Sequence, residues 1–111
     1  MQRVREKELA YRGGDSGVKY LMRGPRIDWG VILLLSGETL GGHYHREVEE
    51  TFYVLEGEAT FVVNGTEYAA QAGDVFRMEA EDRHDIRVDG PASLKLLFIK
   101  CPYLPDDKVS V

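Results

Sequence analysis

Short runs of apolar residues, many of them β-branched or aromatic, alternate along this chain with turns that contain glycine. Runs of this kind are typical of strands, and no segment repeats apolar residues at helical spacing over about 11 residues. Their recurrence about every 8–12 residues predicts an all-β sandwich or barrel with little helix. The predicted strands are 18–22, 29–35, 42–46, 50–55, 59–63, 66–70, 75–78, 85–88 and 93–100.

Local signals add detail to this pattern. Asn64-Gly65 predicts a tight hairpin, because both residues tolerate the positive φ that a two-residue type I′ turn requires. Segment 6–11 is compatible with a short turn of helix. Segment 101–105 contains two prolines, so we expect it to leave the sheet and to pack across the barrel or onto a partner.

Length and composition fit one globular domain spanning residues 1–111. Hydrophobic residues make up 43% of the chain and charged residues 30%, which is enough apolar material for one core. The net charge of −5 argues against nucleic-acid binding, since contact with a phosphate backbone needs clustered lysine and arginine. The longest apolar run, residues 31–35, is far shorter than the ~20 residues that span a bilayer, so we expect no membrane insertion.

Cysteine content and the start of the chain predict a cytoplasmic protein. Cys101 is the only cysteine, so no intrachain disulfide can form, which fits a reducing compartment. We interpret Cys101 as a small buried hydrophobic residue and not as a catalytic thiol. The charged segment 1–8 has no apolar stretch of the kind found in signal peptides.

The histidines and one glutamate form a candidate chemical group. His43 and His45 are two residues apart, which on a strand directs both imidazoles to one face. Glu50 joins that face only if residues 46–49 bend, because its offset of five from His45 would otherwise place it on the opposite face. Strand histidines are also common at surfaces and in hydrogen-bonded cores, and Glu50 could be a solvated carboxylate at a strand end. Spacing alone leaves these alternatives open.

Residues 37–57 resemble the first motif of the cupin superfamily. That motif reads G-x5-H-x-H-x4-E-x6-G, and every fixed position is met in this chain. The residues at those positions are Gly37, His43, His45, Glu50 and Gly57. The glycines at its ends, like Gly73 further along the chain, are interpreted as turn residues. The resemblance extends over about residues 30–100.

The second cupin motif, G-x5-P-x-G-x2-H-x3-N, is only half met. Gly73 and His84 stand at the right spacing. Glu79, Glu81 and Val88 replace the expected proline, glycine and asparagine. These departures put in question the geometry of the turn before His84 but leave the histidine in place.

The resemblance implies a double-stranded β-helix, the jelly-roll-like cupin barrel, with one metal ion per chain inside it. The ligands it implies are His43, His45, Glu50 and His84. Imidazoles suit Fe, Co, Ni, Cu or Zn, and a carboxylate adds affinity for Mn or Fe, so we expect one divalent ion of this group. Four protein ligands leave two positions of a six-coordinate ion open for water, O₂ or a substrate.

Family members resembling this chain include metal-dependent enzymes that act on small molecules. We therefore expect a dioxygenase-like oxidoreductase, or an isomerase or decarboxylase. The alternative is a non-catalytic module that holds a metal and a small ligand. The resemblance and the open sheet edges also predict a homodimer, bridged by residues 4–9 or by the proline-containing tail.

Candidate pocket residues follow from side-chain chemistry. Arg46, next to the histidine pair, could clamp a substrate carboxylate, although a solvated arginine at a strand end is the alternative. Aromatic and apolar side chains could line the cavity or simply fill the core of a small barrel. These candidates are Trp29, Tyr53, Phe76, Met78 and Phe98.

Overall fold

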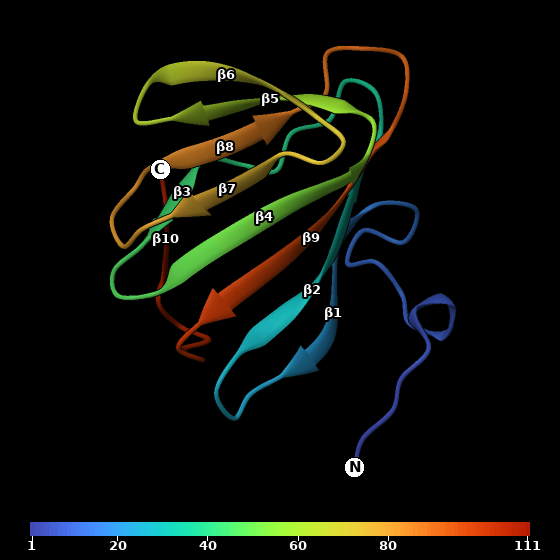
Figure 1. Ribbon diagram of the computed structural model, residues 1–111, viewed down its shortest axis with the longest axis vertical. Helices are drawn as coiled ribbons and strands as arrows, with labels where there is room; N and C mark the ends of the chain where they lie inside the picture. Colours follow the sequence, from blue (N-terminus) through green and yellow to red (C-terminus); the bar gives the residue numbers. More distant parts are fainter.

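The computed structural model describes residues 1–111 and is built almost wholly of strands (Figure 1). Both ends of every predicted strand lie within one residue of their predicted positions. The helical turn is the three-residue η1, and the chain contains no helix long and apolar enough to cross a membrane. In chain order, the elements are η1 (Glu6–Glu8), β1 (Gly17–Arg23), β2 (Asp28–Leu34), β3 (His43–His45), β4 (Glu49–Glu56), β5 (Glu58–Val63), β6 (Thr66–Gln71), β7 (Val75–Met78), β8 (His84–Arg87), β9 (Leu94–Cys101) and β10 (Lys108–Ser110).

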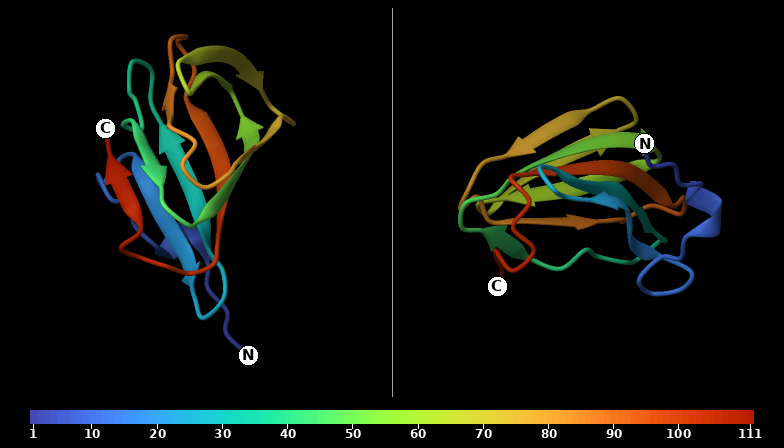
Figure 2. Two further views of the ribbon diagram at one scale, coloured as in Figure 1. Left: turned by 90° about the vertical axis from the view of Figure 1, so that its left-hand side faces the viewer. Right: turned by 90° about the horizontal axis from the view of Figure 1, so that it is seen from below.

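Two five-stranded antiparallel sheets lie against each other as two layers (Figures 1 and 2). One has the order β1-β2-β9-β4-β7 and the other β10-β3-β8-β5-β6. The chain crosses repeatedly from one sheet to the other, so strands distant in sequence become neighbours. This topology is the predicted double-stranded β-helix.

The core lies between the two layers because alternate residues of each strand point inward. On β9, Leu94, Leu96 and Phe98 are fully buried. Phe52 of β4 and Phe61 of β5 meet edge to face across the interior, with their ring centroids 5.7 Å apart. These aromatic contacts fill the end of the barrel next to the histidines.

Glycine is required where the chain turns sharply from β4 into β5. Gly57 has a φ of +88°, and a Cβ there would lie 2.3 Å from the backbone oxygen of Ser93. Gly37 and Gly73 also have positive φ, at +83° and +95°. The prediction that these motif glycines are turn residues is confirmed.

The C-terminal tail leaves β9 and then re-enters the barrel. Segment 102–107 is not a strand, as its prolines predict, but residues 108–110 pair with β3 as β10. The tail therefore crosses its own barrel. The sequence analysis missed β10 because three residues are too few to show an alternating pattern.

Cys101 corrects a prediction. Its side chain is exposed and not buried. Since the inward positions of β9 include Phe98 and Lys100, the next residue, Cys101, faces outward.

Candidate metal centre

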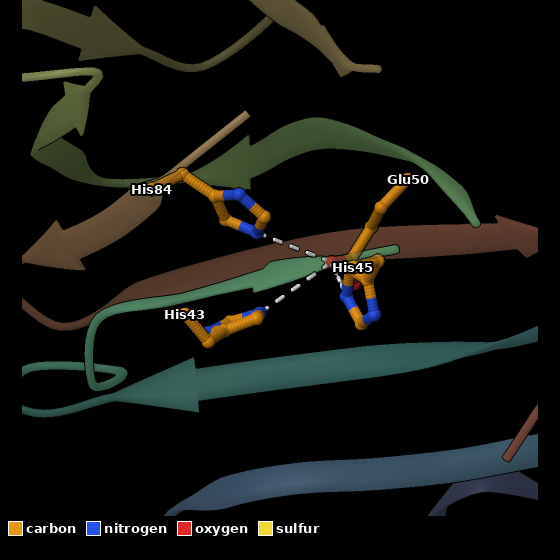
Figure 3. A group of neighbouring side chains, drawn as sticks. All are labelled: His43, His45, Glu50 and His84. Atoms are coloured by element: carbon orange, nitrogen blue, oxygen red, sulfur yellow. Dashed lines mark hydrogen bonds and ion pairs between the residues drawn. The ribbon is translucent and has the colours of Figure 1, made fainter. Parts of the chain in front are cut away.

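The predicted histidines and glutamate meet inside the barrel from both sheets (Figure 3). His43 and His45 lie on β3, and His84 lies directly opposite His43 at the start of β8. Glu50 reaches them from β4, in the other sheet. One potential ligand atom of each residue lies within 4.8 Å of all the others, and all four side chains are buried. The sequence thus predicted the convergence correctly.

The bend that brings Glu50 to the histidines is held by the C-terminal tail. The backbone N–H groups of Glu47 and Val48 donate hydrogen bonds of 2.8 and 2.9 Å to one carboxylate oxygen of Asp107. Val48 is itself buried. Asp107 therefore accepts the hydrogen bonds of two backbone N–H groups in the turn between His45 and Glu50, and this stabilises the turn.

Two histidines have a fixed tautomer. The Nδ1 atoms of His43 and His84 lie 2.9 Å from the backbone oxygens of Gly41 and Asp82. A carbonyl oxygen can only accept, so each Nδ1 carries the hydrogen and donates it. In the neutral rings, the Nε2 lone pairs of His43 and His84 then face the interior of the site. This arrangement of histidines is common around bound metals.

Both lone pairs are directed at Oε1 of Glu50, which lies 3.4 Å from the Nε2 of His84 and 3.8 Å from that of His43. The Nε2 of His45 lies 3.1 Å from the same oxygen, within hydrogen-bond distance. The Nε2 of His84 is buried and has no hydrogen-bond partner. Burial would raise the pKa of Glu50, but hydrogen bonds from imidazoles that carry a hydrogen on Nε2 hold that pKa well below its usual range.

The group fits a divalent transition ion. Two ligands each about 2.1 Å from one ion lie at most about 4.2 Å apart, and the three nitrogen-to-oxygen distances satisfy this limit. All four candidate atoms lie within 4.8 Å of one another, so the group as a whole would need only a small contraction around an ion. Acceptor atoms facing one another without a hydrogen between them repel, and a cation removes that repulsion. The donor set of imidazoles and one carboxylate suits the first-row metals from Mn to Zn.

The departures from the second motif are accommodated in the turn before His84. Glu81, at the glycine position, adopts a φ of +73°. Its N–H donates a 2.7 Å hydrogen bond to the backbone oxygen of His45, which ties this turn to β3. Asp82 accepts hydrogen bonds from the N–H of Glu79 and from the side chain of Asn64. Local hydrogen bonds thus hold the turn without proline or glycine.

A cavity of about 170 Å³ opens beside the histidines and Glu50. It is smaller than the roughly 300–1,000 Å³ sites that take drug-sized ligands. Larger hollows of about 510 and 570 Å³ lie around the loops after β6 and β8 and contain none of the candidate ligands. The side chains that line the cavity besides the candidate ligands are Arg12, Val18, Tyr20, Arg23, Ile32, Leu40, Phe98, Lys100, Leu104, Pro105 and Lys108.

Among the six candidate pocket residues, Phe98 alone lines this cavity. Arg46 and Tyr53 are exposed, and Trp29 lies on the outer face of its sheet. Phe76 stacks on Phe61 at a centroid distance of 4.2 Å and belongs to the core. Met78 is buried in the core too.

The polar wall of the cavity was not predicted from the sequence. Tyr20, Arg23 and Lys100 line it from β1 and β9. The inward direction of Lys100 was predictable, because it lies at even spacing from Leu96 and Phe98 in the run 93–100 and so shares their face of the strand.

Most of the chain matches one known protein family. Residues 30–100 match the family model described as the cupin domain. The chain belongs to the cupin family. The match contains both predicted motifs and all four candidate ligands.

Curated relatives of this cupin have different activities. A 53-residue segment is 38% identical to quercetin 2,3-dioxygenase of Bacillus subtilis and covers 48% of this chain and 16% of that protein. A 63-residue segment is 33% identical to an oxalate-binding protein of Thermotoga maritima and covers 57% of this chain and 52% of that protein. The chain thus spans about half of one curated relative and much less of the other.

A solved structure supports the fold of this cupin. A conserved Klebsiella pneumoniae protein with a double-stranded β-helix domain superposes with a TM-score of 0.86 at 18% identity. The match covers 100% of this chain and 97% of that protein. At this sequence identity, the similarity supports a shared fold but not a shared activity.

Removing the Asp107 carboxylate should destabilise this cupin. In Asp107→Ala, two backbone N–H groups lose their acceptor, one of them on buried Val48, so we expect a loss of about 1–3 kcal/mol. Asp107→Asn should lose less, because both hydrogen bonds end on a single oxygen that an amide can supply. Chemical denaturation measures the loss, with exposed Asp106→Ala as the control. Equal stability of D107A and D106A would contradict the assigned role.

The ionised form of Asp107 makes the folding stability depend on pH. Burial would raise the pKa of Asp107, but the N–H groups of Glu47 and Val48 lower it below its usual range. Because the folded pKa is depressed, this stabilisation is present above the unfolded pKa of about 3.9 and is lost as pH falls through the folded value. The stability difference between wild type and D107A should therefore narrow in acid.

Proposed function

We propose that this cupin binds one divalent transition-metal ion per chain through His43, His45, Glu50 and His84. We propose further that it is a metal-dependent enzyme acting on a small molecule, of the dioxygenase, isomerase or decarboxylase type. The observation that carries the proposal is the convergence of imidazole lone pairs on the buried Glu50 oxygen, with the Nε2 of His84 left without a partner. Apart from a cation, only added protons would satisfy this arrangement.

The metal would act as a Lewis acid, or as a redox centre if it is Fe, Mn, Cu, Co or Ni. The chain's own residues prepare the site for that role. The backbone oxygens of Gly41 and Asp82 orient two imidazoles. Phe98 and Ile32 add apolar surface to the cavity wall. Glu50 lowers the charge of a bound divalent ion from +2 to +1, which leaves it attractive to an oxygen-bearing substrate.

The experiment is metal analysis of protein purified without chelator, followed by thermal shift on adding Mn, Fe, Co, Ni, Cu or Zn. We expect about one equivalent of metal and a raised melting temperature with at least one ion, since a ligand that binds only the folded state stabilises it. Less than about one tenth of an equivalent, with no thermal shift from any ion, would overturn the proposal.

Turnover is tested separately on the metal-loaded protein. The assays are O₂ uptake with diols, diketones, catechols and thiols, and isomerisation of sugar phosphates. The quercetin 2,3-dioxygenase relative supports including flavonols. Turnover in any of these assays establishes an enzyme.

The second candidate function is a non-catalytic module that binds a metal and a small ligand. The relative named an oxalate-binding protein favours this reading. Full metal occupancy with ligand binding and no turnover in any assay would select it over the enzyme.

A homodimer and a cytoplasmic location also belong to this proposal. Leu97, Tyr53 and Val75 are neighbours across β9, β4 and β7 on the outer face of their sheet. Tyr53 and Val75 are 44% and 58% exposed. An apolar row of this kind would be covered by a second copy.

A further inference from the structure

The cavity beside the candidate metal centre is cationic, although the chain as a whole is acidic. Four of its lining side chains, Arg12, Arg23, Lys100 and Lys108, carry positive charge, and Glu50 is the only acid among them. The whole chain carries a net charge of −5. This concentration of positive charge in one small cavity favours an anionic ligand.

Lys100 lies beside the candidate ligand Glu50 in its sheet. In the register of β4 and β9 it lies directly opposite Glu50, and in the register of β2 and β9 it lies opposite Asp28. Directly opposed residues of an antiparallel pair have Cβ atoms about 4.5–5.5 Å apart. Lys100 therefore shares the inward face with Glu50 and is its immediate neighbour.

The ammonium of Lys100 is held in place with donor capacity left over. Its Nζ donates a 2.8 Å hydrogen bond to the Tyr20 hydroxyl and lies 3.6 Å from Asp28 Oδ2. The lysine side chain is only 14% exposed. An ammonium has three N–H donors, and the structure gives this one a single hydrogen-bond acceptor. The Tyr20 hydroxyl accepts from Lys100 and has its own hydrogen free to donate.

Asp28 compensates the charge of this lysine only in part, because it is shared with Arg23. Both oxygens of the buried Asp28 already accept hydrogen bonds of 3.0 Å from Arg23, in a two-pronged pair. The Arg23 guanidinium also lies 3.9 Å above the Tyr20 ring. Arg23 and Lys100 thus share the single negative charge of Asp28, so this wall of the cavity keeps an excess positive charge. An anionic ligand would balance that excess.

We infer that Lys100 and Tyr20 form a subsite for the carboxylate of a small organic acid whose second oxygen function lies toward the candidate metal centre. This inference rests on the proposed function and specifies its substrate class. A 2-oxo acid, a 2-hydroxy acid or a short dicarboxylate carries an oxygen beside the carboxylate. The cavity volume of about 170 Å³ limits the ligand to this small size. Arg23, fixed by Asp28, supports the subsite by keeping Tyr20 in place.

The experiment measures binding of pyruvate, lactate and oxalate to the metal-loaded protein by calorimetry, with methyl pyruvate as the uncharged probe. Wild type should bind at least one of the acids, and pyruvate more tightly than its methyl ester. Lys100→Met should weaken acid binding by about 10–100-fold, the range expected for a lost charge-assisted hydrogen bond, and should abolish the preference over the ester. Tyr20→Phe, which removes only the hydroxyl, should weaken binding by a smaller factor.

The matched control is Lys95→Met, the same change on the same strand. Lys95 faces outward and pairs with Glu6 at 2.8 Å, so K95M should bind the acids as wild type does. Metal content is measured in every variant. Wild type that holds metal but binds none of the acids, or K100M that binds them with unchanged affinity, would overturn this inference and leave the proposed function standing. Wild type that takes up no metal would overturn both.

Discussion

Replacing Glu50 by glutamine should abolish the proposed metal binding of this cupin without unfolding it. The change removes the one anionic ligand of the proposed site, so we expect the affinity for the preferred ion to fall by more than about 100-fold, given that changes outside the ligand shell already cost 10–100-fold. The metal-free variant should still fold but should melt below metal-free wild type. The imidazoles that hold the pKa of Glu50 low stabilise its ionised form in the folded state, and a glutamine loses that stabilisation. Metal titration and thermal melts with and without chelator measure both effects.

The neighbouring Glu49 supplies the control. Glu49 is exposed and faces away from the interior, so Glu49→Gln should keep full metal content and the same melting temperature. The two variants change neighbouring residues of β4, one facing inward and one outward. They therefore test whether metal binding depends on the inward-facing carboxylate. Wild-type affinity in E50Q would remove Glu50 from the site, and a parallel loss in E49Q would point to a general effect of charge.

The four candidate ligands were predictable because the family motif fixes their spacing in sequence. What the sequence did not show is how Glu50 reaches the histidines. The bend at 46–49 depends on Asp107, which lies about 60 residues further along the chain and joins the turn only after the tail has crossed the barrel. The sequence of a loop contains no pattern that reveals hydrogen-bond partners far away along the chain.

The second motif shows the same limit. Glu79 and Glu81 stand where the motif has proline and glycine. The turn nevertheless keeps a positive φ at Glu81 and brings His84 to the other three candidate ligands. Hydrogen bonds to Asp82 and Asn64 supply the constraint that proline and glycine supply elsewhere in the family. The geometry of the turn is therefore retained while the residues that encode it differ.

The pocket was predicted poorly because residue type was given more weight than strand alternation. Tyr53 is aromatic, but it follows inward-facing Phe52 and must point outward. Lys100 is charged, but it follows Leu96 and Phe98 at even spacing and must point inward. Alternation, applied strictly to β4 and β9, would have placed both side chains correctly.

Truncating Phe52 should lower the folding stability strongly and metal binding only slightly, the reverse of the change at Glu50. Phe52 is fully buried, packs against Phe61 and lies 5.7 Å from the His84 ring, centroid to centroid. Phe52→Ala removes most of this contact and leaves a cavity in the core, so we expect a loss of about 3–5 kcal/mol in unfolding free energy. Denaturant unfolding of the metal-free protein gives this number directly.

The matched variant is Tyr53→Ala, one residue along the same strand and on its outer face. Tyr53 is 44% exposed and contributes cross-strand contacts with Leu97 and Val75, so we expect a loss of at most about 1 kcal/mol. Metal binding to folded Phe52→Ala should weaken only modestly, because the four ligands remain and only the packing around His84 is lost. Stability would thus depend on Phe52 and metal content on Glu50, two residues apart on one inward face. If F52A and Y53A were equally stable, the core would not be organised around this aromatic pair.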